Sequence, residues 1–225
     1  MKPTVCIIDY CMGNLFSITQ ACIKSGMQII ASSEPNEIKK ADAIVMPGVG
    51  AFPHAMNKLV SQGIVDALDD FRDTGKPLIG ICLGMQLLFE KSSEFTESKG
   101  LGYVPGEVVH LSNLFDRNCR HSDRSRIPHT GWAQVCPAQE FRSKNSERKL
   151  IWEATENKEM YFVHSFVAAP KDPEDILSRS NYGGLDFCSS VQKDNVFGFQ
   201  FHPEKSGRNG LMLCQQLNTI IKLNQ

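Results

Sequence analysis

Two short segments of this 225-residue chain hold the residues that can do covalent chemistry. The segment Gly80–Gly84 (GICLG) places Cys82 between an apolar run and a helical pattern. Glycines around a central nucleophile at a strand-to-helix turn are the pattern of a nucleophile elbow, which lifts the nucleophile clear of the sheet. Far downstream, His202 and Glu204 lie two residues apart. In this order, the residues predict a cysteine nucleophile, a histidine base and a glutamate that orients the base.

Each of these residues also has a purely structural interpretation, as an inert buried cysteine or as a surface His-Glu pair. For the chemistry, Cys82 must lose its proton, because the thiolate is the nucleophile. The start of the following helix favours negative charge on the sulfur, and His202 can accept the proton. Alternation along a strand predicts that His202 and Glu204 share a face, so the carboxylate can hold one ring nitrogen while the other faces the thiol.

Attack on a carbonyl creates an oxyanion that backbone amides must stabilise. The amide of Leu83, directly after the nucleophile, is one natural donor, and Val49 or Gly50 in an upstream glycine loop can supply the second. That loop is not a dinucleotide-binding fingerprint, because Pro53 stands where the third glycine is required. Nor does the chain carry a phosphate-binding Gly-Lys-Ser/Thr, because Pro77 follows Gly75-Lys76.

The composition narrows the class of protein. Lys+Arg total 24 and Asp+Glu total 25, which argues against nucleic-acid binding, and no apolar run is long enough to span a membrane. The eight cysteines form no Cys-x-x-Cys pair, which favours reduced thiols and a cytoplasmic location. His110, Cys119, His121 and His129 match no standard zinc spacing, so no metal is expected.

The elements that must position these residues begin as alternating strands and helices, which predict a parallel sheet covered on both faces. The expected strands are Thr4–Tyr10, Met27–Ala31, Ala43–Met46 and Lys76–Ile81. The expected helices are Leu15–Ser25, Pro35–Lys40 and Met56–Arg72. Ligands bind beyond the carboxyl ends of such strands, where Cys82 and the Gly48–Gly50 loop both lie.

The pattern of the second half of the sequence predicts an antiparallel extension of the sheet and a closing helix. The whole chain, residues 1–225, is expected to form one domain. The expected strands are Glu107–Leu111, Trp132–Cys136 and Met160–Val167, then a hairpin of Leu185–Gln192 with Val196–His202, and the helix is Leu211–Leu223. Ser112–Arg126 is polar and rich in arginine. It is interpreted either as a surface loop or as an insertion that contacts an anionic ligand or a partner.

Taken together, the chain resembles the triad (class I) glutamine amidotransferases, and among them the glutaminase subunits of imidazole glycerol phosphate synthase. The resemblance covers nearly the whole chain. Its segments are Asp9–Tyr10, Met12–Asn14, Pro47–Phe52, Gly80–Glu90, Gly100–Gly102, Pro128–His129, Gly131–Trp132, Phe162–Ser165 and Gln200–Ser206. The resemblance implies a three-layer α/β sandwich with a mostly parallel central sheet, flavodoxin-like, with an antiparallel extension.

The resemblance also implies residue roles. Cys82 would attack the side-chain amide of L-glutamine, His202 would act as acid and then base, and Glu204 would orient it. Leu83, with Val49 if its peptide is suitably oriented, would form the oxyanion hole. The residues implied to hold glutamine are Gly50, Gln86, Glu94, His164, Ser165 and Phe166. No cofactor or metal is implied.

Finally, the resemblance implies a partner. A (β/α)8-barrel cyclase would receive the ammonia in a heterodimer and form imidazole glycerol phosphate in histidine biosynthesis. Plausible contacts are Met12–Asn14, Pro128–Trp132 and Lys205–Ser206. Three alternatives remain open: a paralogous glutaminase serving another synthase, such as a surface-sugar amidotransferase; a peptidase-like or amidase-like hydrolase; and a non-catalytic glutamine-binding scaffold.

Overall fold

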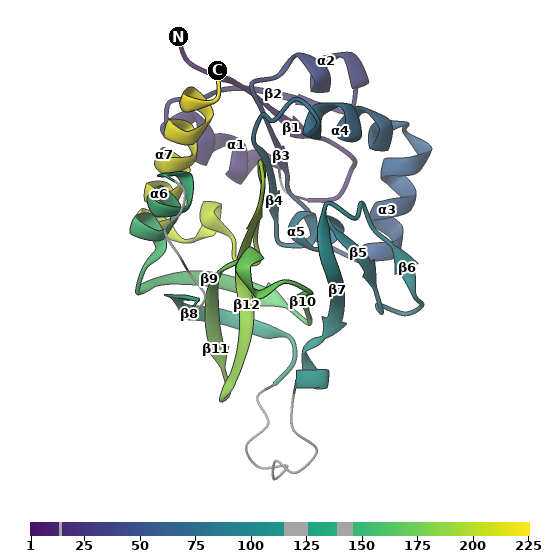
Figure 1. Ribbon diagram of the computed structural model, residues 1–225, viewed down its shortest axis with the longest axis vertical. Helices are drawn as coiled ribbons and strands as arrows, with labels where there is room; N and C mark the ends of the chain where they lie inside the picture. The colour runs from purple at the N-terminus through teal and green to yellow at the C-terminus, as the bar shows by residue number, and fades with distance from the viewer. Residues whose placement is uncertain (14, 115–125, 139–145) are drawn as a thin grey trace.

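The computed structural model describes residues 1–13, 15–114, 126–138 and 146–225 (Figure 1). Over these residues the chain forms a 9-stranded sheet in the order β2-β1-β3-β4-β13-β12-β11-β8-β9, and a 4-stranded sheet in the order β10-β7-β5-β6. The first five strands of the large sheet are parallel. They are β1 (Thr4–Ile8), β2 (Gln28–Ser32), β3 (Ala43–Met46), β4 (Leu78–Ile81) and β13 (Val196–Phe199).

Strands β3 and β4 are buried along their whole length, as expected for parallel strands covered on both faces. Side chains of β1 alternate between two hydrophobic clusters: Cys6 and Ile8 belong to one, and Val5 and Ile7 to the other. The two clusters therefore lie on opposite faces of the sheet. The order β2-β1-β3-β4-β13 is the flavodoxin-like order, in agreement with the fold that the resemblance implied.

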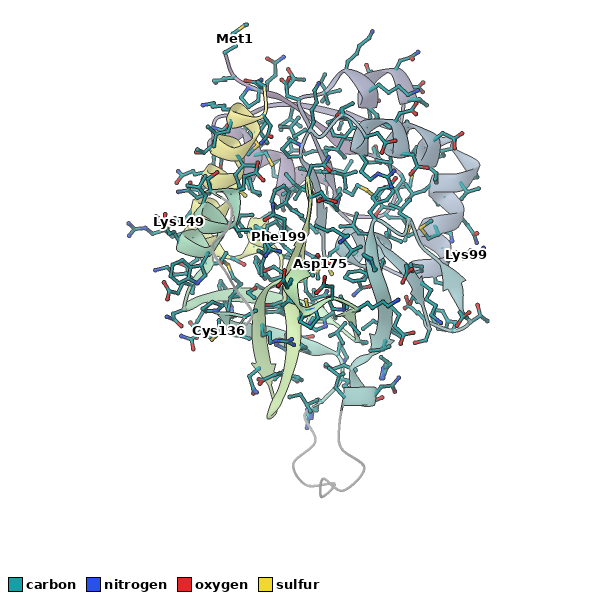
Figure 2. All side chains as sticks on the ribbon, in the orientation of Figure 1. Met1, Lys99, Cys136, Lys149, Asp175 and Phe199 are labelled. Atoms are coloured by element: carbon teal, nitrogen blue, oxygen red, sulfur yellow. The ribbon has the colours of Figure 1, made fainter. Side chains whose placement is uncertain are left out.

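Helices complete the outer layers on both faces (Figure 1). One face carries α2, α3 and α4, of which α4 contacts both others, and the other face carries α1, α6 and α7. The helices are α1 (Leu15–Lys24), α2 (Pro35–Lys40), α3 (Phe52–Ser61), α4 (Ile64–Arg72), α5 (Leu83–Leu87), α6 (Ser146–Thr155) and α7 (Gly207–Leu223). In Figure 2, Phe199 lies in the interior, whereas Lys149 and Lys99 project from opposite flanks. No helix in the described ranges is long and apolar enough to cross a membrane.

The second half adds antiparallel strands to the large sheet, as predicted. They are β8 (His129–Pro137), β9 (Lys158–His164), β11 (Ile176–Tyr182) and β12 (Leu185–Lys193). The small sheet holds β5 (Phe89–Ser92), β6 (Ser98–Lys99), β7 (Val104–His110) and β10 (Phe166–Pro170). Single turns of 3-10 helix lie at η1 (Leu111–Leu114), η3 (Pro173–Asp175) and η4 (Pro203–Lys205).

Three predicted elements are wrong in a way that affects the site. The helix expected over residues 56–72 is two helices, because Gly63 takes the left-handed conformation with φ of 65° between them. The strand expected over residues 160–167 is two strands in different sheets, divided at Ser165. The strand expected to reach His202 ends at Phe199, so His202 and Glu204 lie on a turn and not on a strand. Most of Ser112–Arg126 lies outside the described residues.

The turn from β4 into α5 is built by two close backbone approaches. A side chain at Gly80 would lie 2.6 Å from the carbonyl oxygen of Gly84. A side chain at Gly84 would overlap the backbone carbonyl of Met46 on the neighbouring strand β3. Cys82 lies between them with φ of 54°, a left-handed backbone conformation that residues other than glycine rarely adopt. The two glycines are therefore a packing requirement of the elbow.

This packing predicts a large effect of Gly84→Ala. The added methyl group collides with backbone that cannot move aside, so the free energy of unfolding should fall by about 3 kcal/mol or more. Gly63→Ala is the matched control, because its only cost is a left-handed φ in open space, which is worth about 1 kcal/mol. Urea unfolding of both variants measures the difference. Equal losses would contradict the close approach at Met46.

Candidate active site

Cys82 lies at the end of β4, where its backbone is fixed from two sides. Its N–H donates to the carbonyl of Phe199 at 2.7 Å, and its own carbonyl accepts from the N–H of Gln86 at 3.1 Å. Helix α5 begins at the next residue, Leu83. The Cys82 side chain is only 6% exposed, but it borders a cavity. The predicted nucleophile elbow is present, with the sulfur beside the free amide groups at the start of a helix.

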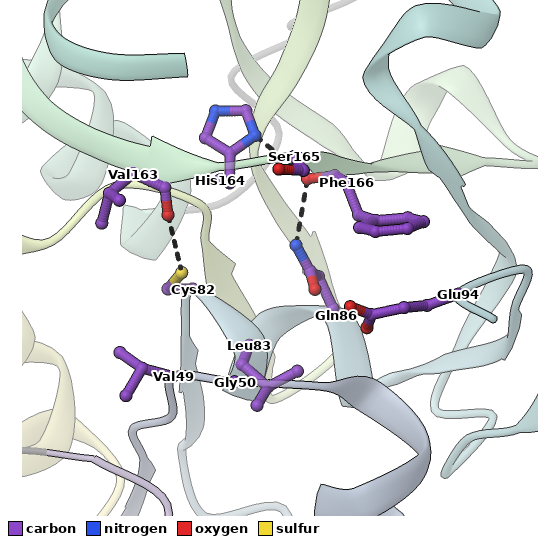
Figure 3. Close-up of a pocket in the computed structure, with 10 residues that line it drawn as sticks. All are labelled: Val49, Gly50, Cys82, Leu83, Gln86, Glu94, Val163, His164, Ser165 and Phe166. Atoms are coloured by element: carbon purple, nitrogen blue, oxygen red, sulfur yellow. Dashed lines mark hydrogen bonds between the residues drawn. The ribbon is translucent and has the colours of Figure 1, made fainter. Parts of the chain in front are cut away.

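The sulfur of Cys82 takes part in two hydrogen bonds, as donor in one and as acceptor in the other. The thiol donates to the carbonyl of Val163 at 3.8 Å (Figure 3). The side-chain Nε2 of Gln200 donates to the sulfur at 3.6 Å. Gln200 is fully buried. The carbonyl suits the protonated thiol, whereas the amide N–H suits the thiolate, so both forms of Cys82 have a partner.

His202 and Glu204 form the second half of the predicted triad. Nδ1 of His202 is 2.7 Å from Oε1 of Glu204, and both side chains are buried. Nε2 of His202 is buried and has no hydrogen-bond partner among the described residues. Although burial alone lowers it, the pKa of His202 is raised to about 10 by its interactions with Cys82 and Glu204. The interactions with Cys82 and Glu204 therefore favour the protonated form of His202.

A cavity of about 240 Å³ opens next to Cys82 and suits a small ligand. It is lined by Val49, Gly50, Cys82, Leu83, Gln86, Glu94, Val163, His164, Ser165 and Phe166 (Figure 3). This set contains the predicted nucleophile, both predicted oxyanion-hole residues and all six predicted glutamine-binding residues. His202 and Glu204 lie instead along a narrow neighbouring cleft with Val49 and Lys205. The roles of the six cavity residues in glutamine binding, and of the triad in catalysis, remain predictions.

The polar side chains of the cavity present acceptors. Nε2 of Gln86 uses its two N–H groups on the carbonyl of Phe166 and on Oε1 of Gln200, each at 3.0 Å. Only the Gln86 oxygen is left for a ligand. One oxygen of Glu94 accepts from the N–H of Phe52 at 2.7 Å, which holds the carboxylate at the start of α3. Gln86 and Glu94 therefore favour a ligand that places a cationic or N–H-rich group beside their oxygens.

The two predicted oxyanion donors differ in readiness. Leu83 is the first residue of α5, so its N–H has no acceptor within the helix. The N–H of Val49 donates to the carbonyl of Met12 at 3.3 Å and is thereby used outside the cavity. Val49 can serve as a donor only after its peptide turns. In this conformation the cavity offers Leu83 without Val49.

The His164 side chain points away from Cys82 in Figure 3, so this residue borders the cavity through its backbone. Its Nδ1 donates to the carbonyl of Phe166 at 3.0 Å, and its Nε2 accepts from Nδ1 of His129 at 3.1 Å. Burial lowers the pKa of both rings, to about 4 for His129 and about 3 for His164. This neutral histidine pair supports the wall of the cavity. No group of side chains in the described ranges is arranged to hold a metal ion.

Comparison with known proteins places this geometry in a family. The family model described as "Glutamine amidotransferase class-I" matches residues 6–216. This chain belongs to the class I glutamine amidotransferases. The predicted family is therefore confirmed.

Individual class I glutamine amidotransferases are similar to this chain over almost their whole length. "Imidazole glycerol phosphate synthase subunit HisH" of Sulfurimonas denitrificans is 41% identical over 94% of this chain and 95% of its own. The HisH subunit of Wolinella succinogenes is 43% identical over 95% of this chain and 98% of its own. Among solved structures, one titled "glutamine amidotransferase" has a TM-score of 0.71 at 18% identity, over 97% of this chain and 98% of its own. PurLQS from Thermotoga maritima has a TM-score of 0.69 at 18% identity, over 96% and 98% of the two chains. These two structures confirm the predicted fold class.

In this class I glutamine amidotransferase, sequence reasoning missed two residues that support the site, Gln200 and His129. Both lie inside segments that carried the resemblance. Their spacing gives no sign that their side chains meet Cys82 and His164. Those contacts depend on how β13 and β8 are placed next to β4 and β9, which only the folded structure shows.

The histidine pair predicts that this glutamine amidotransferase loses stability in acid. Because the pKa of His129 falls from 6.5 to about 4 on folding, the unfolded chain binds more protons between these values. The contribution of His129 is present above about pH 6.5 and is lost as the pH falls towards 4. The raised pKa of His202 acts in the opposite direction, since its contribution is lost as the pH rises through about 10.

Urea unfolding at several pH values tests this with His129→Phe, whose ring keeps the stacking on Phe162 and Tyr182. The variant should be less stable by about 1–3 kcal/mol at pH 7, because His164 loses its donor. It should also lose less stability than the wild type on acidification. His54→Gln, at an exposed position on α3, is the control and should keep the wild-type slope. An unchanged slope in His129→Phe would refute the assignment.

Proposed function

We propose that this chain is a glutaminase subunit of an imidazole glycerol phosphate synthase, with residues 1–225 forming one glutaminase domain. It hydrolyses L-glutamine to glutamate and ammonia and delivers the ammonia to a (β/α)8-barrel cyclase in histidine biosynthesis. The observation that carries the chemistry is Cys82 on the wall of the 240 Å³ cavity, with the bonded pair of His202 and Glu204 along the neighbouring cleft. The names of the HisH relatives carry the pathway. The free cysteines favour a cytoplasmic location.

The first half-reaction begins with the proton on His202. In the attacking form, His202, whose pKa is raised, holds the proton as an imidazolium, and Cys82 is the thiolate of the resulting ion pair. The sulfur attacks the amide carbon of glutamine, and the N–H of Leu83 stabilises the oxyanion. When the C–N bond breaks, His202 gives its proton to the leaving nitrogen. Ammonia departs, and a glutamyl thioester remains on Cys82.

The second half-reaction needs His202 as a base. Once the sulfur is acylated, it no longer carries the charge that helped to raise the pKa of His202. Neutral His202 then takes a proton from water, and the hydroxide formed attacks the thioester carbon. Breakage of the C–S bond releases glutamate and restores the ion pair. Glu204 holds Nδ1 throughout, so Nε2 remains the atom that moves protons.

The cavity chemistry supports glutamine as the substrate. The free oxygen of Gln86 and the carboxylate of Glu94 suit the α-ammonium group of an amino acid, at a distance from the sulfur set by α5. Gly50, Ser165 and Phe166 border the same cavity and complete its wall. A cavity of this volume favours a free amino acid over a peptide.

The partner surface is proposed next to the cleft behind the triad. Val49 and Trp132 are 47% and 52% exposed, which is high for large apolar side chains. Lys205 lies over the ring of Tyr161 at 5.9 Å, and Tyr161 packs edge-on against Trp132 at 6.0 Å. These residues form a continuous apolar and basic strip from the cleft to β8. Of the predicted contacts, Ser206 is buried and uses its hydroxyl on His202 and Tyr161, so it supports this strip from inside.

Glutamate release from glutamine tests the reaction and the pathway together. The chain is assayed alone and with a (β/α)8-barrel cyclase and its nucleotide substrate, with Cys82→Ser as the control. We expect release that rises with the cyclase and disappears in the variant. Release that ignores the cyclase would move the chain to another synthase, and hydrolysis of peptides would move it to another hydrolase class. No release under any condition, from folded protein, would favour a non-catalytic scaffold.

The position of the Val49 amide predicts how strongly the partner stimulates the reaction. One oxyanion donor is worth a factor of about 10²–10³ in kcat, and here that donor is bound to Met12. The isolated subunit should therefore turn over about 10²–10³ times more slowly than the loaded complex. Steady-state kinetics with saturating glutamine measure the ratio. A ratio near one would mean that the Val49 peptide need not turn.

A further inference from the structure

A chain of buried side-chain hydrogen bonds leads from the cavity wall to the nucleophile. The carbonyl of Phe166 accepts from Nε2 of Gln86, Oε1 of Gln200 accepts from the same nitrogen, and Nε2 of Gln200 donates to the sulfur of Cys82. The first two distances are 3.0 Å and the third is 3.6 Å. Gln200 is 0% exposed and Gln86 is 5% exposed, so both amides are largely shielded from water.

The network fixes which end of the Gln200 amide faces the sulfur. A backbone carbonyl only accepts hydrogen bonds, so Phe166 requires the NH2 group of Gln86 on its side. The second hydrogen of that NH2 group points to Gln200, which must therefore present its oxygen. The NH2 group of Gln200 is then left for Cys82. The orientation follows from the partners, although an amide oxygen and nitrogen have nearly the same shape.

We propose that Gln200 is a positioning residue that holds the sulfur of Cys82 in its reactive form and ties it to the substrate-binding wall through Gln86. The inference rests on the proposed glutaminase chemistry for its purpose, but its geometry stands on the contacts alone. An amide N–H stabilises a thiolate more than a thiol, because the hydrogen bond to a charged acceptor is stronger. The carbonyl of Val163 does the reverse, since it attracts the thiol proton and repels the thiolate. Ionisation therefore moves the preferred partner of Cys82 from Val163 to Gln200.

The link through Gln86 adds a consequence for substrate binding. Gln86 and Phe166 both border the cavity, so a ligand that presses on this wall acts on the groups that orient Gln200. With both N–H groups of Gln86 engaged, its amide cannot rotate without losing two buried hydrogen bonds. The wall is thereby held in the arrangement that keeps the N–H of Gln200 on the sulfur.

The test is the pH dependence of Cys82 alkylation by iodoacetamide, followed peptide by peptide with mass spectrometry. The main variant is Gln200→Met, which keeps the length of the side chain and removes its donors. A hydrogen bond to a charged group contributes on the order of one pH unit. The midpoint of alkylation should therefore move up by about one unit, and the rate at pH values below the midpoint should fall about 10-fold. Glutaminase kcat should fall with a smaller change in KM.

Two further proteins separate positioning from packing. Gln200→Glu keeps an oxygen for Gln86 but replaces the N–H with a carboxylate, so it should shift the alkylation midpoint at least as far as Gln200→Met. It also serves as the deciding variant if Gln200→Met fails to fold. Gln215→Glu, on the exposed side of α7, carries the same change of side chain and should match the wild type.

The two possible failures give different results. A wild-type alkylation midpoint in folded Gln200→Met or Gln200→Glu would overturn the positioning role and leave Gln200 as packing. A midpoint that shifts in the variants, while the wild-type chain releases no glutamate even with the cyclase, would support the positioning role and refute the proposed function. Alkylation needs no glutamine, so it reads the sulfur independently of turnover.

Discussion

The close approach of α5 to the end of β3 is the constraint on which the rest of the site depends. Gly84 can pass the carbonyl of Met46 only because it has no side chain, and this contact sets where the helix begins. The sulfur of Cys82 then stands at the carboxyl edge of the parallel strands. The same edge receives the Gly48–Gly50 loop from β3 and the turn that holds His202 after β13. The contact between Gly84 and Met46 and the pairing of β13 with β4 thus bring three separate segments to a common edge.

The polarity of the site follows from what surrounds that point. The sulfur contacts an acceptor, the carbonyl of Val163, and a donor, Gln200, while in the proposed reaction His202 supplies a proton from the cleft side. Glu204 and the cavity-facing oxygen of Gln86 are acceptors that remain fixed. A fixed environment of this kind does not need to reorganise when charge moves from sulfur to substrate oxygen. Only the Val49 side of the oxyanion hole lacks this preparation.

The sequence predicted the parallel half of the sheet well, because buried parallel strands read as short apolar runs between turn residues. It failed where local pattern and tertiary context disagree. Gly63 ends one helix before the next begins, although the helical spacing of apolar residues continues across it. Ser165 divides one apolar run between two sheets. His202 and Glu204 meet through a turn, so the strand argument for their pairing was wrong even though the pair exists. Gln200 lies beside the predicted triad, yet only the fold shows what its amide contacts.

The arrangement of Val49 gives the enzyme a reason to be incomplete on its own. Its peptide lies between the glutamine cavity and the exposed strip that ends at Lys205, so it belongs to both surfaces. The N–H of Val49 makes one bond, of 3.3 Å, to the carbonyl of Met12, and under the proposed function a partner bound on this strip would replace it. Ammonia made without an acceptor is wasted. The N–H of Val49 is present but bonded to Met12. Under the proposed function, binding of a partner would therefore complete the oxyanion hole by turning one peptide, and the triad would stay as it is.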